Sequence, residues 1–430
     1  MLEKYKQVSV QSKKYWTRAL KLFPGGINHN IRTFGLDRCH AYPPFMERGQ
    51  GSHLWDIDGN EYIDYWMTHF SMILGHNHPR IKEAIGNQLA KGSHLGALNE
   101  HQVVFGEMLQ EAIPELKRMR FCSTGSEATG YAVRLCRLFT GKPLVAKVLG
   151  GWHGGNDSLG YYLRYPFDDG PYYNGVSFEF NDRDSIDVLM KKHGTKLAAV
   201  IVEPVIGAAG GIPPEPDFLP YLREETAKRD ILLIFDEIIT GFRLCFGVAG
   251  TVVFNVEPDL ITLGKITASG MPLGVYGGRE DVMALAAPGV PGGRWVGGGT
   301  FSSHPLSMVA GIATLHTLRA SKEKYQSLNN NGERFCHQIN EILPQDHAMA
   351  VGTGSIIFIH CLHRPIEEGP LTVTKLGDAF DKAKTDLFQS LLVEEGIFGY
   401  HGLGGLSFVH SQHDLDVTLK AIETVLGTLE

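Results

Sequence analysis

"ILLIFDEIITGFRLCFGVAGTVVFNVEPDLITLGK" (Ile231–Lys265) contains two short, mostly apolar runs, and ionisable residues come shortly after each of them. Runs without polar alternation are typical of strands that are buried on both faces of a parallel sheet. Asp236 and Glu237 follow the first run, and Lys265 follows the second after one glycine. Because a lysine is costly to desolvate, its position at the end of a buried strand requires a chemical explanation.

The same pattern extends to both sides of this stretch. Short apolar runs alternate with helix-like segments from about Pro79 to Ala310, which predicts an α/β domain with a mostly parallel sheet. Beyond Ala310, longer helical stretches precede two predicted strands, Gly354–His363 and Gly404–Gln412, in a smaller α+β region.

The N-terminal part of the chain is different in character. We expect one helix over Leu2–Phe23, then a hairpin over Gly51–Trp66 that turns at Asp58-Gly59. The chain therefore divides into 1–65, an N-terminal helix and hairpin in the small domain; 66–310, the large domain; and 311–430, the C-terminal part of the small domain.

Composition excludes several function classes. The 430 residues include 40 basic and 47 acidic ones, and a net charge of −7 disfavours nucleic acid or an anionic membrane as a partner. No apolar run reaches about 18 residues, the length a membrane-spanning helix needs, and the polar N-terminus does not resemble a signal peptide. The six scattered cysteines are expected to be free thiols, which indicates the cytoplasm.

Side chains that follow parallel strands meet at one edge of a sheet, where open α/β folds bind ligands. By this rule, Lys265 would lie near Asp236 and Glu203, near Trp152-His153, and near the turn Thr124-Gly125-Ser126 before a helix. Small residues at a helix start bind anions, although an ordinary helix cap explains the same letters. Pyridoxal 5'-phosphate needs a lysine for a Schiff base, an aspartate for its ring nitrogen, a phosphate site and a stacking ring, and this set supplies all four.

With these residues, the chain resembles the class III (fold type I) pyridoxal-phosphate-dependent aminotransferases, and among them the glutamate-1-semialdehyde 2,1-aminomutase subgroup. The resemblance covers nearly the whole chain and rests on strings such as "STGSEATGYAVRLCRLFTGK", "GGWHGGNDSL", "FDEIITGFR" and "GTFSSHPLSMVAG". It implies a large cofactor-binding domain and a homodimer with shared active sites.

The resemblance also implies roles for individual residues. Lys265 would form the Schiff base and move a proton, and Asp236 would keep the ring nitrogen protonated. Thr124, Gly125 and Ser126 would hold the phosphate, together with Thr300 of the second copy. Trp152 would stack on the ring beside His153, and Glu203 would support the cofactor. Arg32 would bind a substrate carboxylate, with His69 near the substrate.

Departures from the aminomutase pattern concern the substrate. The subgroup has Ser where this chain has His29, Trp where it has His69, Asn where it has Ala208 and Glu where it has Gly405. We therefore expect an intermolecular aminotransferase with a ping-pong mechanism, acting on a small-molecule amino donor and a keto acceptor. The alternative is an intramolecular 2,1-aminomutase, and a racemase is a further pyridoxal-phosphate reaction.

Two interpretations from other classes are less favoured. A non-catalytic protein with this fold would be expected to lose Lys265 or Asp236, and both are present. A metal enzyme is disfavoured because no HExxH motif occurs, and because Met67 stands where the calcium-loop-like string from Asp56 would need glutamate.

Overall fold

A computed structural model describes residues 2–167 and 175–429, and the chain divides into two compact units. Unit 1 comprises residues 1–78, 327–366 and 379–430, and unit 2 comprises 79–326 and 367–378. The predicted domain boundaries lie at 65/66 and 310/311, whereas the units divide at 78/79 and 326/327. Residues 367–378 belong to the larger unit although they come late in the chain.

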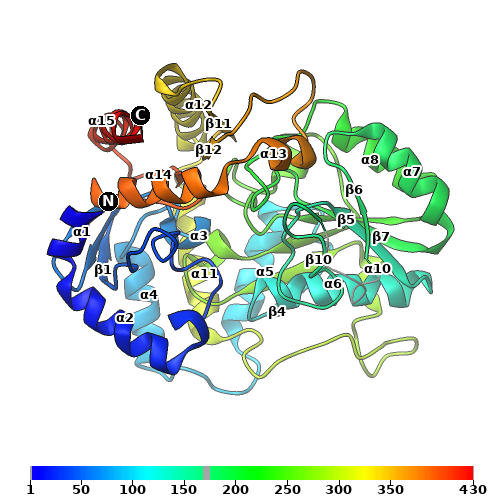
Figure 1. Ribbon diagram of the computed structural model, residues 1–430. Coiled ribbons are helices and arrows are strands. Elements are labelled where there is room, and N and C mark those ends of the chain that lie inside the picture. Colours follow the sequence, from blue (N-terminus) through cyan, green and yellow to red (C-terminus); the bar gives the residue numbers. More distant parts are fainter. Residues whose placement is uncertain (1, 168–174, 430) are drawn as a thin grey trace. The chain divides into compact units, whose positions relative to one another are not determined.

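Unit 2 is built on a sheet that has seven strands in the described part of the chain, in the order β4-β10-β9-β8-β7-β5-β6 (Figure 1). Its strands are β4 (Arg118–Cys122), β5 (Leu144–Val148), β6 (Val176–Phe178), β7 (Leu197–Val202), β8 (Leu232–Asp236), β9 (Leu260–Leu263) and β10 (Gly274–Gly278). All pairs are parallel except the two that involve β10, so the predicted mostly parallel α/β sheet is confirmed.

Helices accompany these strands in the predicted alternation. They are α4 (Pro79–Leu89), α5 (Glu100–Ala112), α6 (Gly125–Thr140), α7 (Arg183–His193), α8 (Phe218–Ala227), α9 (Ala249–Val252), α10 (Glu280–Ala284), α11 (Pro305–Arg319) and α13 (Val373–Ala379). Helix α6 packs against β9 and β10 over a core that includes the fully buried Val133, Leu135, Ile201 and Ile234.

The strand β10 was not predicted, because its sequence GVYGG has low intrinsic preference for a strand. Its glycines are needed for packing. A Cβ on Gly274 would lie 2.2 Å from the Thr124 carbonyl oxygen, and one on Gly278 would lie 2.2 Å from that of Asp259. The strand therefore passes too close to neighbouring backbone for larger residues there.

Unit 1 contains two small sheets among its described residues, β1-β2-β3-β13 and β11-β12-β14. Their strands are β1 (Met46–Gln50), β2 (His53–Asp56), β3 (Glu61–Asp64), β11 (Ala348–Thr353), β12 (Ile356–Cys361), β13 (Ile397–Phe398) and β14 (Gly404–Gly405). The helices are α1 (Glu3–Val8), α2 (Val10–Leu22), α3 (Met67–Phe70), α14 (Lys382–Glu394), α15 (Gln412–Leu429) and most of α12 (Lys324–Ile342). The hairpin at Asp58-Gly59 is present, as predicted, between β2 and β3.

Two predictions in unit 1 need correction. The expected single N-terminal helix is broken at Ser9, whose φ of −117° and ψ of 43° are not helical and whose hydroxyl donates to the Tyr5 carbonyl. The strand expected over Gly404–Gln412 is limited to Gly404–Gly405, because α15 begins at Gln412 and the Ser407 backbone NH bonds to the His410 ring instead of a strand.

Candidate active site

The ionisable residues singled out in the sequence follow parallel strands of unit 2. Asp236 ends β8, Glu203 follows β7, and His153 lies on the loop after β5. Lys265 opens a 3₁₀ turn, Lys265–Ala268, one residue beyond β9. Because these strands are parallel, their carboxyl ends lie at one edge of the sheet.

Asp236 and His153 form a buried pair. His153 Nδ1 lies 2.8 Å from Asp236 Oδ2, and both side chains are almost fully excluded from solvent. Asp236 Oδ1 also accepts hydrogen bonds from the Ile238 backbone NH at 3.1 Å and the Thr262 hydroxyl at 3.2 Å. The Thr129 hydroxyl donates to the His153 carbonyl at 2.5 Å, so both partners are held from several elements.

Glu203 holds the loop that follows β5. Its two carboxylate oxygens accept from the backbone NH groups of Trp152, at 3.2 Å, and Gly207, at 3.1 Å. Burial is the largest influence on Glu203 and raises its pKa, while the nearby His153 acts in the opposite direction. The Trp152 side chain, whose backbone NH Glu203 binds, is 37% exposed. An aromatic ring is therefore available to a ligand next to this buried carboxylate.

Lys265 has an unusual backbone and a perturbed amine. Its φ of 45° is in the left-handed region, which costs a residue other than glycine about 1 kcal/mol or more and is typical of functional sites. Burial of the ammonium lowers the pKa of Lys265 to about 8, although Asp236 and Glu203 act in the opposite direction. Near neutral pH, a useful fraction of this amine is therefore uncharged and nucleophilic.

The turn before α6 forms a helix cap. The Thr124 hydroxyl accepts from the Glu127 backbone NH at 3.2 Å, and the Glu127 carboxylate accepts from Ser123 NH at 2.7 Å and Thr124 NH at 3.2 Å. The structural alternative for Thr124, an ordinary N-cap, is thus present. Ser126 Oγ accepts from the Gly155 NH at 3.1 Å, which joins this helix start to the Trp152-His153 loop.

Glycines allow close packing around this helix start. A Cβ on Gly125 would lie 2.6 Å from Ile238 Cδ1, and one on Gly154 would lie 2.5 Å from Ser126 Cα. Gly154 also has a φ of +93°, which a larger residue rarely adopts. Backbone NH groups at the start of a 16-residue helix form an electropositive surface suited to an anion.

Thr300 lies elsewhere in unit 2, on an irregular stretch before α11, and it is exposed. The neighbouring Gly299 NH donates to the Ser302 hydroxyl at 3.1 Å. Trp295 and Phe301 on the same stretch are 82% and 57% exposed, so two large apolar side chains close to Thr300 in the sequence are open to solvent in the single chain.

Arg32 and His69 belong to unit 1, where they lie on two turns that meet at the His29 and His69 rings. The His69 ring stacks on Trp66 with centroids 4.4 Å apart and a 13° angle, and it meets the edge of His29 at 6.2 Å. Arg32 is exposed, and its backbone NH donates to the His29 carbonyl at 3.1 Å. His69 lies in a turn in which Met67–Phe70 all have left-handed φ values, from 44° to 66°.

Two buried cations were missed by sequence reasoning. Arg243 is fully excluded from solvent, burial lowers its pKa to about 10, and its charge helps to lower the pKa of Lys265. Lys147 is also fully buried, on β5. In both cases the available signal was a single basic residue inside an otherwise apolar run.

The described ranges lack two further kinds of feature. Residues 2–167 and 175–429 contain no group of three or more His, Cys, Asp or Glu side chains arranged to hold a metal ion. In the same ranges, no helix combines the length and the apolar character needed to cross a membrane.

The chain matches a known protein family over most of its length. The family model of the class-III aminotransferases matches residues 37–159 and 161–386. The chain is 36% identical to a glutamate-1-semialdehyde 2,1-aminomutase of Syntrophomonas wolfei subsp. wolfei, over 97% of both proteins. It is 34% identical to the enzyme of that name from Thermoplasma volcanium, over 98% of this chain and 100% of the relative.

A solved structure is similar over the same extent. It is an omega-transaminase from Sphaerobacter thermophilus, which is 30% identical with a TM-score of 0.85 and covers 97% of each chain. The fold is therefore that of the fold type I transaminases, as predicted.

Proposed function

Because the chain belongs to the class-III aminotransferase family, we propose that it moves an amino group between neighbouring carbons of an amino-aldehyde that carries a carboxylate. It is an enzyme with pyridoxal 5'-phosphate as its cofactor. The observation that carries amino-group transfer is the Lys265 amine, whose pKa is lowered to about 8 beside Asp236 and Glu203. The reaction within that class, a 2,1-aminomutase, is supported by the names of the curated relatives.

This proposal revises the order of the two sequence-based hypotheses. The intermolecular aminotransferase was the preferred interpretation because residues such as His29 and His69 depart from the aminomutase pattern. The relatives support the alternative better, since their 34–36% identity extends over nearly the whole length of both proteins.

The residues at the sheet edge fit the cofactor. Asp236 is a buried carboxylate suited to a cationic ring nitrogen, and Trp152 offers a partly exposed ring for stacking. His153 Nε2 is buried and, among the described residues, has no hydrogen-bond partner. Gly125 and Gly154 allow the chain to pack closely around Ser126 at the start of α6, where backbone NH groups are suited to bind a phosphate.

When bound, pyridoxal phosphate withdraws electrons from the substrate carbon that bears the amino group. Lys265 would hold the cofactor through its amine until the substrate amine takes its place. The released Lys265 amine would then accept a proton from the substrate carbon and deliver it to the cofactor carbon. A pKa of about 8 suits both tasks, because the amine is readily deprotonated yet basic enough to accept the proton.

The remaining residues would hold the cofactor and orient the substrate. Asp236, fixed by His153, would keep a proton on the ring nitrogen, and Glu203 would hold the loop that presents Trp152. Thr124, Gly125 and Ser126 would bind the phosphate at the α6 N-terminus. Arg32 would bind the substrate carboxylate, since a guanidinium forms paired hydrogen bonds with that group, and His69 would contact the substrate.

We further propose a homodimer in the cytoplasm. The exposed Thr300 would complete the phosphate site of a second copy, and the exposed Trp295 and Phe301 around it are suited to burial in such an interface. All six cysteines are free, which supports a reducing compartment.

The second candidate function is intermolecular transamination between a small-molecule amino donor and a keto acceptor. The likeness to the omega-transaminase, which is 30% identical over 97% of each chain, supports it.

The test is to supply cofactor-loaded enzyme with glutamate-1-semialdehyde and no amino donor. We expect the enzyme to convert this substrate to the isomeric amino-ketone acid and to release no keto acid. Chromatography of the reaction mixture measures both compounds. Keto-acid release that requires a donor, with no isomerisation, would instead establish the second candidate, and the absence of both reactions would contradict amino-group transfer.

A further inference from the structure

A buried lysine outside the proposed catalytic set controls the loop that carries Trp152 and His153. Lys147 is the fourth residue of β5, paired with Ile201 of β7 and Ser177 of β6 inside the sheet. Its side chain is fully buried, and its ammonium lies 5.1 Å from the centroid of the Tyr161 ring. An apolar residue of similar length would fill the same space without the cost of desolvating a charge.

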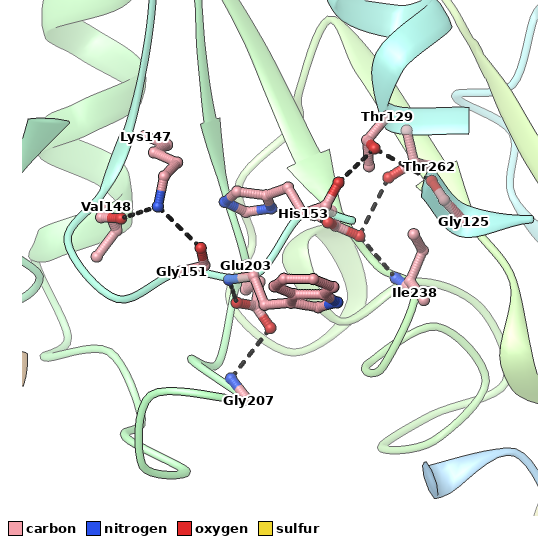
Figure 2. Close-up of polar contacts among 12 residues, drawn as sticks. Gly125, Thr129, Lys147, Val148, Gly151, His153, Glu203, Gly207, Ile238 and Thr262 are labelled. Carbon is pink, nitrogen blue, oxygen red and sulfur yellow. Dashed lines mark hydrogen bonds and ion pairs between the residues drawn. The ribbon is translucent and has the colours of Figure 1, made fainter. Parts of the chain in front are cut away.

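The ammonium of Lys147 binds both ends of one turn. Its Nζ donates to the Val148 carbonyl at 3.3 Å and to the Gly151 carbonyl at 2.9 Å (Figure 2). The same turn is closed by the Gly151 backbone NH, which donates to the Val148 carbonyl at 3.1 Å. Lys147 therefore fixes where the chain leaves β5 and in which direction it continues.

That direction determines the position of the proposed cofactor residues. Directly after Gly151, the Trp152 NH bonds to Glu203 and the His153 ring bonds to Asp236. Little space separates the turn from His153, because a Cβ on Gly151 would lie 3.1 Å from His153 Nε2. A shift of the turn would thus be transmitted to the His153–Asp236 pair.

We propose that Lys147 is a positioning residue, whose ammonium fixes the Val148–Gly151 turn and so aligns Trp152 and His153 with Asp236 and Glu203. This inference rests on the proposed function for the meaning of that alignment. The turn geometry itself does not depend on it.

The test compares Lys147→Met with Lys142→Met. Lys142 is a control, because its Nζ also donates to two backbone carbonyls, those of Arg229 at 3.3 Å and Asp230 at 3.2 Å, but it precedes β5 and does not contact the turn after this strand in these hydrogen bonds. Hydrogen exchange of the cofactor-free proteins is followed by mass spectrometry. We expect Lys147→Met to accelerate exchange in peptides that cover 149–153, with no change in β8, and Lys142→Met to leave both segments unchanged.

The cofactor supplies a second measurement. Titration of the apoproteins with pyridoxal phosphate should give Lys147→Met an affinity about 10- to 100-fold weaker than wild type, since small misplacements of binding groups have effects of this size. Lys147→Gln keeps a neutral hydrogen-bond donor, so its affinity for pyridoxal phosphate should lie between those of Lys147→Met and wild type.

Each outcome decides the inference. Unchanged exchange and affinity in Lys147→Met would overturn it while the proposed function stood. If both Lys147 variants failed to fold where Lys142→Met folds, the residue would serve the whole fold and the positioning role would be wrong. Wild-type protein that binds no cofactor would contradict the proposed function, whereas the exchange result would still test the turn.

Discussion

At the residue scale, Lys265 combines a strained backbone with a weakened base. Its left-handed φ of 45° follows a glycine at the end of β9, and burial lowers its pKa to about 8. A charged surface lysine would have neither feature. The account explains both, because an amine that must attach a cofactor and then carry a proton has to be held in place and largely dehydrated.

The lowered pKa of Lys265 makes a prediction about stability. Between pH about 8 and its ordinary value of 10.5, the unfolded chain binds more protons at this residue than the folded one, so stability rises with pH there. Lys265→Met removes this contribution. The apoprotein variant should therefore be more stable than wild type at pH 7, and this advantage should disappear above pH 10.5.

Urea unfolding of both apoproteins across this range measures the difference. Groups that do not interact with Lys265 affect both proteins alike and cancel in the comparison, so the difference reports on Lys265 together with its charged neighbours. An advantage for Lys265→Met that does not change with pH would contradict the lowered pKa.

The positions of the proposed site residues were predictable from sequence only where a strand end marked them. Asp236, Glu203 and Lys265 each follow an apolar run, and parallel pairing brings such ends together. Lys147 and Arg243 lie in such runs as well, but a single letter does not reveal which way a long side chain extends within a sheet. Their burial depends on packing between elements, which the sequence pattern does not specify.

At the element scale, the turn Met67–Phe70 is the most strained part of unit 1. Its four residues all have positive φ values, and none is glycine. The turn is held by hydrogen bonds from the Phe70 NH to the Trp66 carbonyl at 3.0 Å and from the Ser71 NH to that of Met67 at 2.8 Å. The stack of His69 on Trp66 depends on this conformation.

Thr68 gives a direct test of that strain, since it is exposed and β-branched with a φ of 50°. Thr68→Gly should raise the free energy of unfolding by about 1 kcal/mol, because glycine adopts this region without a steric cost. Thr68→Ala retains a Cβ and should gain little. A glycine variant less stable than the alanine variant in urea unfolding would contradict a left-handed turn.

Elements with strong patterns were predicted well, and those defined by tertiary contacts were not. The strands β5, β7, β8 and β9 and the helix α6 follow from apolar runs and from the Thr124 cap. The strand β10 was missed because glycine-rich sequence forms a strand only where neighbouring backbone excludes larger residues. The break at Ser9 is likewise stabilised by a tertiary contact that periodicity does not show, because the Asp58 carboxylate accepts from the backbone NH groups of Gln11 and Ser12 at the start of α2.

At the scale of the whole molecule, the account proposes that two chains share each active site. Lys265 of one copy and Thr300 of the other would then serve the same cofactor. The proposal can be tested by mixing inactive variants, because a shared site can be rebuilt from two different defects.

Lys265→Ala and Thr300→Glu should each be nearly inactive as homodimers. After the two are unfolded and refolded together, mixed dimers should contain one intact site, and about one quarter of wild-type activity should return. Thr300→Ala with Thr300→Glu serves as the control, since that mixture repairs no site. Activity of the first mixture no higher than that of its parents would place Thr300 in its own chain's site or in none.

The central claim is that Lys265 carries the cofactor, and borohydride reduction tests it most directly. The cofactor-loaded protein is reduced, digested and mapped by mass spectrometry. The account predicts one pyridoxyl group per chain, on Lys265, and none in Lys265→Ala. A group on Lys147, which is fully buried on β5, or on any other lysine would contradict the assignment.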